Sequence, residues 1–165
     1  MMIDIRFPDR SVRSFEEGVT GYQIAESISP RLAADVLAVS VKADDDTAVG
    51  KGNVIGLDTP IVKNSSVRLL KWDDPEGKHV FWHSSAHLMA QALEALYPGV
   101  KFGIGPALEN GFYYDVDLGD KVLSDNDLPA IEKKMLEFAH SRLAFQCDHV
   151  AKADAVKYYK QKGDE

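Results

Sequence analysis

The sequence predicts an α+β protein built as a small mixed domain followed by a second, partial α+β domain. Short stretches in which apolar and polar residues alternate open the chain, a capped helix follows them, and β-branched stretches complete the first domain. A polar, turn-prone segment then precedes a long helical stretch that carries two histidines four residues apart. At 165 residues, of which 45% are hydrophobic and 27% charged, the chain is long enough for two small packed domains.

The first two elements are predicted to be strands joined by a tight turn. Ile3, Ile5 and Phe7 alternate with polar residues, as expected of a strand that buries one face. Turn-forming residues occupy positions 8–11, and a second short strand is expected at 12–15. A strand pair of this kind needs a helix or further strands to cover its apolar face.

A capped helix is predicted next. Thr20, with Gln23 three residues later, fits a capping box, in which each of the two side chains accepts from a backbone N–H at the start of the helix. Pro30 should end this helix near Ser29, because the residue before a proline disfavours helical dihedral angles.

The order of the elements indicates the fold of the first domain. Strands are predicted at 36–41 and 66–70, so the order is strand, strand, helix, then strands. This is the order of a β-grasp, or ubiquitin-like, fold, although spacing alone leaves other α+β arrangements open. The segment 73–77 is polar and turn-prone, which places the expected boundary between a first domain at 1–72 and a second at 73–165. Asp74 before Pro75 in this segment suits the N-cap and first turn of a helix.

The second domain is predicted to combine helices with short strands. We expect a helix from about His79 to Tyr97, strands at 103–106 and 112–118 joined by an Asn-Gly turn, a helix from Ser124 or Asp127 to Arg142, a strand at 144–150 and a helical tail from Ala151. The apolar face of the first helix is expected to hold Phe81, Leu88, Met89, Ala92, Leu93, Ala95 and Leu96, and that of the second Leu128, Ile131, Met135 and Phe138.

The residues most informative about chemistry are His83 and His87. Four residues apart on a helix, they project from the same side about 5.4 Å apart along the axis, so both imidazoles can reach one water, metal ion or substrate oxygen. At 100° per residue they fall roughly opposite the apolar face, which suits an accessible site. The alternative is that two such histidines simply lie on an exposed helix face, and spacing alone favours that interpretation.

Other chemical signatures are weaker. No glutamate follows His83 directly, so the metalloprotease pattern is not met, and Ser84 and Ser85 lack the surroundings of a hydrolase nucleophile. We expect the remaining histidines to have no partner at metal-ligand spacing, apart from Cys147 and His149, where a metal site is the less favoured interpretation.

Charge and apolar patterning exclude several classes of protein. The net charge is −7, which argues against a dominant basic surface for nucleic acid. No stretch approaches the roughly 18 apolar residues of a membrane span, and no targeting signal opens the chain, so we expect a cytoplasmic protein without a membrane partner. The single cysteine precludes an intramolecular disulfide.

Two segments carry a resemblance to a known family. They read His83-Ser-Ser-Ala-His87-Leu-Met-Ala-Gln-Ala and Gly103-Ile-Gly-Pro-Ala-Leu-Glu-Asn-Gly-Phe-Tyr-Tyr-Asp-Val-Asp117. Together they resemble the editing domain of bacterial threonyl-tRNA synthetases, and residues 1–72 are similar to the TGS domain that precedes it in that family. Alanyl-type editing proteins share the first segment but do not carry a TGS domain in front of it.

The resemblance implies an N-terminal part of a threonine-tRNA ligase, a class II synthetase. His83 and His87 would lie in the editing pocket, which hydrolyses serine wrongly attached to tRNA(Thr), and Tyr114 would line the same pocket. The family completes this pocket with a cysteine followed four residues later by a histidine, and this chain has no such segment. Cys147 and His149 have the wrong spacing, so the isolated chain is expected to be inactive.

The resemblance also implies partners and cofactors. The partners are the acceptor end of tRNA(Thr), the rest of the synthetase chain, and a second copy of the parent in a homodimer. ATP and zinc are implied for the catalytic domain that this chain lacks, and no cofactor is implied for the chain itself. Two other interpretations stay open: a non-catalytic RNA-binding or adaptor module, and a zinc protein with His83 and His87 as ligands.

Overall fold

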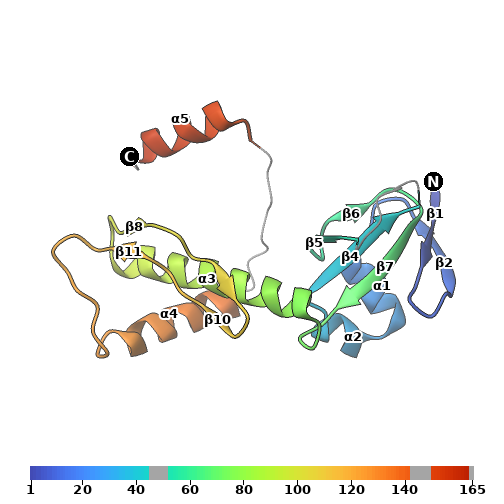
Figure 1. The fold of residues 1–165 in the computed structure, drawn as a ribbon, viewed down its shortest axis with the longest axis horizontal. Coiled ribbons are helices and arrows are strands. Elements are labelled where there is room, and N and C mark those ends of the chain that lie inside the picture. The colour runs from blue at the N-terminus through green and yellow to red at the C-terminus, as the bar shows by residue number, and fades with distance from the viewer. Residues whose placement is uncertain (45–51, 142–149, 164–165) are drawn as a thin grey trace. The chain divides into compact units, whose positions relative to one another are not determined.

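The computed structural model describes residues 1–44, 52–141 and 150–163 and confirms the α+β class. The chain divides into two compact units, the first formed by Met1–Ser84 with Ala107–Gly111 and the second by Ser85–Pro106 with Phe112–Glu165. The long helix α3 (Pro75–Leu96) carries both His83 and His87, as predicted, and begins in the first unit (Figure 1). The predicted boundary at 72/73 stays a prediction.

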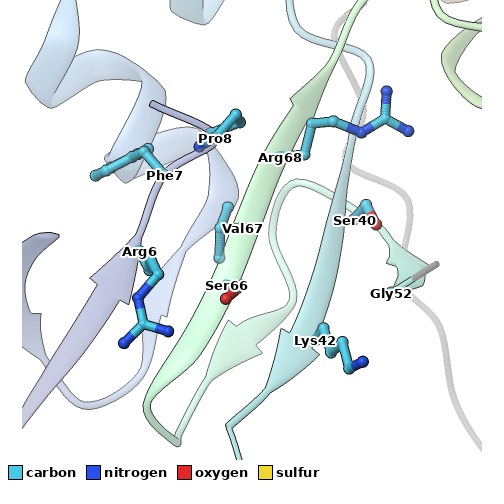
Figure 2. A pocket seen from close by; sticks show the side chains of 9 residues that line it. All are labelled: Arg6, Phe7, Pro8, Ser40, Lys42, Gly52, Ser66, Val67 and Arg68. Carbon is cyan, nitrogen blue, oxygen red and sulfur yellow. The ribbon is translucent and has the colours of Figure 1, made fainter. Parts of the chain in front are cut away.

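The first unit is built on a mixed five-stranded sheet. Its strands, in spatial order, are β2 (Val12–Glu16), β1 (Met2–Arg6), β7 (Ser65–Leu70), β4 (Ala38–Ala43) and β5 (Asn53–Ile55). The pair β1 and β7 is parallel and the other pairs are antiparallel, and Figure 2 shows β1, β7 and β4 side by side. A separate two-stranded pair joins β3 (Val19–Thr20) to β6 (Pro60–Ile61).

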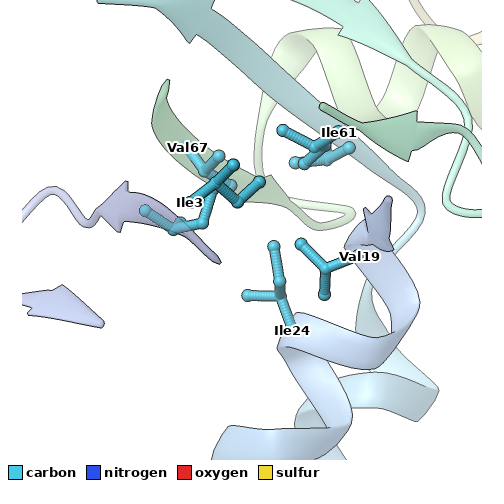
Figure 3. Close-up of a cluster of buried hydrophobic side chains, with 7 residues drawn as sticks. Ile3, Val19, Ile24, Ile61 and Val67 are labelled. Atoms are coloured by element: carbon cyan, nitrogen blue, oxygen red, sulfur yellow. The ribbon is translucent and has the colours of Figure 1, made fainter. Parts of the chain in front are cut away.

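The core of the first unit lies between the sheet and helix α1 (Gly21–Ile28). Ile3 and Ile5 are 4% and 0% exposed while their strand neighbours are exposed, which confirms the predicted half-buried strand. Ile24 of α1 is fully buried and points toward these strand residues (Figure 3). Burying side chains of this size contributes about 1.5–3 kcal/mol each, so this cluster stabilises the unit.

Both ends of α1 follow from the sequence. Thr20 Oγ1 accepts from the backbone N–H of Gln23 at 3.2 Å and Gln23 Oε1 accepts from that of Thr20 at 3.0 Å, which confirms the capping box. The helix ends at Ile28, as Pro30 predicted. A helix that was not predicted, α2 (Pro30–Asp35), begins directly afterwards. Ser29 is its N-cap, because Ser29 Oγ accepts a hydrogen bond from the backbone N–H of Leu32 at 3.0 Å, and proline suits the first turn of a helix.

The second part of the chain has shorter strands than predicted. Helix α3 ends before Pro98, and four two-residue strands follow: β8 (Lys101–Phe102) with β11 (Val116–Asp117), and β9 (Ala107–Leu108) with β10 (Gly111–Phe112). The Asn-Gly turn is confirmed between β9 and β10. The strand expected at 103–106 was wrong and that at 112–118 is interrupted. The backbone N–H of Gly103 still donates to the Asp115 carbonyl at 2.8 Å and that of Asp115 to the Ile104 carbonyl at 3.0 Å, but Pro106 has no N–H with which to continue such pairing.

The remaining helices are α4 (Leu128–His140) and α5 (Lys152–Lys162), which confirm the two that were predicted. Ile131 is 6% exposed, as expected, but Leu128 is exposed because a side chain in the first turn leans toward the open N-terminal end of its helix.

In α3, Ala92 and Leu93 are buried whereas Phe81 and Ala95 are exposed. The strand predicted at 144–150 lies outside the described residues, apart from Val150. Among the described residues, each helix is either too short or too polar to be a candidate membrane span.

Asp127 links the start of α4 to the end of α3 within the second unit. Its carboxylate accepts from the Oγ and backbone N–H of Ser124 at 2.7 and 2.8 Å, and from the Tyr97 hydroxyl at 3.4 Å. The Ser124 hydrogen bonds lower the pKa of Asp127, and desolvation together with the nearby Asp127 charge raises the pKa of Tyr97. The carboxylate is therefore favoured in its charged form.

This arrangement predicts a pH dependence of stability. Because the pKa of Asp127 is lower in the folded state than in the unfolded chain, its contribution is present above the unfolded pKa and is lost as the pH falls through the folded pKa. Ser124→Ala should raise the pKa of Asp127 and weaken this acid dependence, as measured by carboxyl NMR titration and by unfolding at pH 3–6. Ser141→Ala, which removes a hydroxyl from the end of α4, is the control, and equal behaviour of the two variants would contradict the assignment.

Candidate functional site

The histidine helix is fastened to the sheet at its first turn. Arg68 of β7 contacts Asp74 at 2.7 Å and Glu76 at 3.3 Å, and the backbone N–H of Lys71 donates to Asp74 Oδ2 at 2.8 Å. Gly77 lies so close to the end of β7 that a Cβ there would be 2.2 Å from the Lys71 carbonyl oxygen. These contacts start α3 at Pro75, which agrees with the predicted Asp74-Pro75 helix start and lies four residues before the helical period that begins at His79.

An aromatic cluster supports the next turns of α3. Trp72, Phe81 and Trp82 meet edge to face with ring centroids 5.1–5.6 Å apart, and the Lys78 ammonium lies 5.5 Å from the Trp72 ring centroid. Such aromatic pairs stabilise by about 0.5–1.5 kcal/mol beyond the area they bury. The helix is therefore held in place directly before His83.

His83 and His87 are both exposed on α3. Because four residues make slightly more than one helical turn, the two imidazoles leave the helix from the same side. Gln91 and Glu94, which continue that side, are also exposed, whereas Ala86 and Leu93 are buried on the other. The predicted access of solvent to the pair agrees with the structure, and a catalytic role for it stays a prediction.

A third histidine continues the same row. His79 lies four residues before His83, so the expectation that it has no partner at ligand spacing was wrong. This four-residue spacing is visible in the sequence alone. It is exposed and lines a hollow of about 390 Å³ together with Asp73, Lys78 and Glu109. Lys78 Nζ donates to Asn110 Oδ1 at 2.6 Å, which ties α3 to the β9–β10 turn.

The ring of Tyr114 packs against residues of the second unit. Its ring lies edge to face with Phe102, with centroids 5.4 Å apart, and a Cβ on Gly105 would be 2.4 Å from it. Tyr114 is half-buried whereas Tyr113 and Asp115 are exposed, which agrees with the predicted alternation. Gly105 therefore makes room for the tyrosine ring, and membership of Tyr114 in the histidine site stays a prediction.

The possibility of a metal centre depends on how many ligands the described residues bring together. Within them, no group of three or more His, Cys, Asp or Glu side chains is placed to hold a metal ion. Tetrahedral zinc takes four ligands, of which His83 and His87 would supply two. Cys147 and His149 lie outside the described residues.

Comparison with known proteins gives a consistent result over the whole chain. No family model matches it. It is 55% identical over 164 residues to a threonine-tRNA ligase of Parabacteroides distasonis and 54% identical over 163 residues to one of Bacteroides thetaiotaomicron. The ligase of Cytophaga hutchinsonii is 51% identical over 163 residues. Each match covers 99% of this chain but 24% of the relative, so the chain spans about a quarter of their length. Across its whole length the chain is therefore a homologue of the corresponding part of the threonine-tRNA ligases.

Proposed function

We propose that this chain forms part of a threonine-tRNA ligase and contributes to the hydrolytic removal of serine from mischarged tRNA(Thr). The observation that carries the proposal is the exposed pair His83 and His87, on one side of a helix that is anchored at its start, in a chain 50–55% identical to such ligases. The partners would be the acceptor end of tRNA(Thr) and the rest of the ligase, itself a homodimer that uses ATP and zinc in its catalytic domain.

A physical need for such a step supports the proposal. Serine differs from threonine by one methyl group, and a pocket discriminates one missing methyl by only about 1–3 kcal/mol. A second site that has no room for the methyl can hydrolyse the smaller ester selectively. Editing therefore adds selectivity that binding at the synthetic site does not supply.

The histidine pair suits hydrolysis of an aminoacyl ester. A water oxygen attacks the ester carbonyl carbon and loses a proton to a neutral imidazole, and collapse of the tetrahedral intermediate breaks the bond to the ribose oxygen. The leaving ribose oxygen takes up a proton from an imidazolium, which restores the neutral ring. Imidazole titrates near pH 7, so one such pair can serve both transfers, with one ring positioning the water or ribose and the other carrying the proton.

The proposal is tested in a chimera. The matching region of the Parabacteroides distasonis ligase is replaced by this chain, and hydrolysis of Ser-tRNA(Thr) and Thr-tRNA(Thr) is followed. We expect the chimera to hydrolyse the serine ester and spare the threonine ester, and the isolated chain to hydrolyse neither. A chimera that attaches threonine but leaves Ser-tRNA(Thr) intact would contradict the editing role. Hydrolysis by the isolated chain, lost in His83→Ala, would contradict only its inactivity.

A further inference from the structure

An asparagine followed by a glycine lies where the β9–β10 hairpin contacts the start of α3. Glu109 and Asn110 are the two turn residues, and Gly111 begins β10. Asn110 is exposed, and Lys78 of α3 donates from Nζ to Asn110 Oδ1 at 2.6 Å. Residues 107–111 and the first part of α3 both belong to the first unit, so this contact lies within one compact unit. The hydrolytic step proposed for the histidine pair does not use the Asn110 amide.

Gly111 leaves the side-chain amide of Asn110 open to attack by the backbone. A glycine has no Cβ, so its nitrogen is less shielded than that of other residues and its backbone turns more freely. Gly111 has a φ of +150°, in the region that favours glycine, and a Cβ there would meet no atom within 4 Å. A succinimide ring, which joins the nitrogen of Gly111 to Cγ of Asn110, therefore has room to form.

Lys78 is placed to stabilise the charge that develops during such an attack. An ammonium group has donors only, so the Asn110 atom that it contacts is the carbonyl oxygen. Attack at Cγ moves negative charge onto this oxygen, and a donor already aimed at it lowers the barrier without further reorganisation. Lys78 is half-buried and its ammonium lies 5.5 Å from the Trp72 ring centroid, which helps to hold the side chain in place.

The other asparagines of the sequence lack this combination, since none of them precedes a glycine. Asn64 precedes Ser65, which is 1% exposed and paired within the five-stranded sheet. Asn64 Oδ1 also accepts from the backbone N–H of Asp4 at 2.9 Å. Asn53 and Asn126 precede residues whose side chains shield the backbone nitrogen. Asn110 is therefore the asparagine at which a succinimide should form first.

We propose that Asn110 is a site of spontaneous deamidation promoted by Lys78. The backbone nitrogen of Gly111 loses its proton to hydroxide and attacks Cγ of Asn110, which forms the N–Cγ bond. The bond from Cγ to Nδ2 then breaks, and Nδ2 takes a proton from water and leaves as ammonia. Water opens the succinimide in one of two ways. Cleavage of the N–Cγ bond yields aspartate, and cleavage of the bond to the backbone carbonyl carbon of residue 110 yields isoaspartate.

Both products place a carboxylate in the turn that contacts α3. Aspartate keeps the length of the backbone and converts the Lys78 contact into an ion pair. Isoaspartate adds a methylene group to the backbone, which alters the turn and moves the carboxylate away from the position of the original amide. The modification therefore changes the contact between α3 and the β9–β10 turn, beside the hollow that His79 and Glu109 line.

The test follows the 165-residue chain during incubation at mildly alkaline pH, where the backbone nitrogen loses its proton more readily. Peptide mapping by mass spectrometry locates each amide that becomes a carboxyl group, and a protein isoaspartate methyltransferase with a labelled methyl donor detects isoaspartate. We expect conversion at Asn110 before any other asparagine, with both products present. Asn110→Gln should abolish the isoaspartate signal from this turn.

Substitution of Lys78 tests its part in the reaction. Lys78→Met should slow conversion of Asn110 about tenfold, the effect of one charge-assisted hydrogen bond on a transition state. Lys78→Arg keeps a cationic donor and should convert as the unmodified chain does, and tryptophan fluorescence checks that both variants are folded. Lys133→Met, which removes an exposed lysine from α4, is the matched control and should leave the rate unchanged.

Two results would overturn the proposal. One is an Asn110 that stays an amide throughout the incubation, whether or not another asparagine converts. The other is a folded Lys78→Met chain that converts as fast as the unmodified chain or faster, because the ammonium would then not promote the reaction. Neither result bears on the histidine pair, so the proposed editing function is tested separately.

Discussion

Alanine at His83 or at His87 is expected to slow Ser-tRNA(Thr) hydrolysis by the chimeric ligase by about 10²–10⁴-fold, the usual contribution of a general acid or base. Attachment of threonine should be unchanged, because the proposed role of the pair is confined to the editing step. Both side chains are exposed, so truncation leaves no buried cavity and the fold should tolerate it. The measurement is single-turnover deacylation of Ser-tRNA(Thr), with threonylation followed in parallel.

His140→Ala is the matched control for these variants, because it removes an exposed imidazole from the end of α4 instead of α3. Its deacylation rate should equal that of the unmodified chimera. Full activity in both His83→Ala and His87→Ala would show that the exposed pair is only a helix surface and would favour the adaptor interpretation.

Gly77→Ala should destabilise the first unit although it places a better helix former in α3. Alanine is favoured over glycine inside a helix by about 1 kcal/mol. The added Cβ would, however, lie 2.2 Å from the Lys71 carbonyl oxygen, and that backbone cannot rotate away as a side chain could. Overpacking of this kind typically costs about 1–3 kcal/mol, and here it also forces Asp74 and Glu76 away from Arg68. The steric cost therefore exceeds the gain in helix propensity.

Urea unfolding monitored by tryptophan fluorescence measures this effect, since Trp72 and Trp82 lie in the aromatic cluster beside the substitution. We expect a free energy of unfolding lower by about 1–2 kcal/mol. Gln91→Ala, at an exposed position of the same helix, is the control and should change it little. A stabilised Gly77→Ala protein would show that α3 is not packed closely against the end of β7.

Helices and strands that carry a pattern within their own residues could be predicted from the sequence. The alternation of Ile3 and Ile5 identified β1, and the Thr20–Gln23 pair identified the start of α1. Strands β3, β5 and β6 have two or three residues, too few for a periodic pattern, and only their partners define them. The start of α3 at Pro75 was indicated by the Asp74-Pro75 pair, whereas the contacts of Asp74 with Arg68 and Lys71 have no signal in the sequence.

The candidate sites show the same division. Histidine spacing on one helix was sufficient to predict that His83 and His87 share an exposed side. The neighbours of Ser66 in the sheet could not be predicted, because Arg6 and Lys42 lie far from it in sequence and pair with it only through the register of β1, β7 and β4. A site that lies on one element is visible in a sequence, whereas one that spans strands requires their register.

The most direct test of the histidine site is a double-mutant cycle. Two groups that act on one ester form a unit, so removing the second costs little once the first is gone. In the chimera, His83→Ala/His87→Ala should therefore hydrolyse Ser-tRNA(Thr) about as slowly as the slower single variant. A double variant whose fold-reduction in hydrolysis rate equals the product of the two single-variant reductions would contradict joint action of the two imidazoles on one substrate.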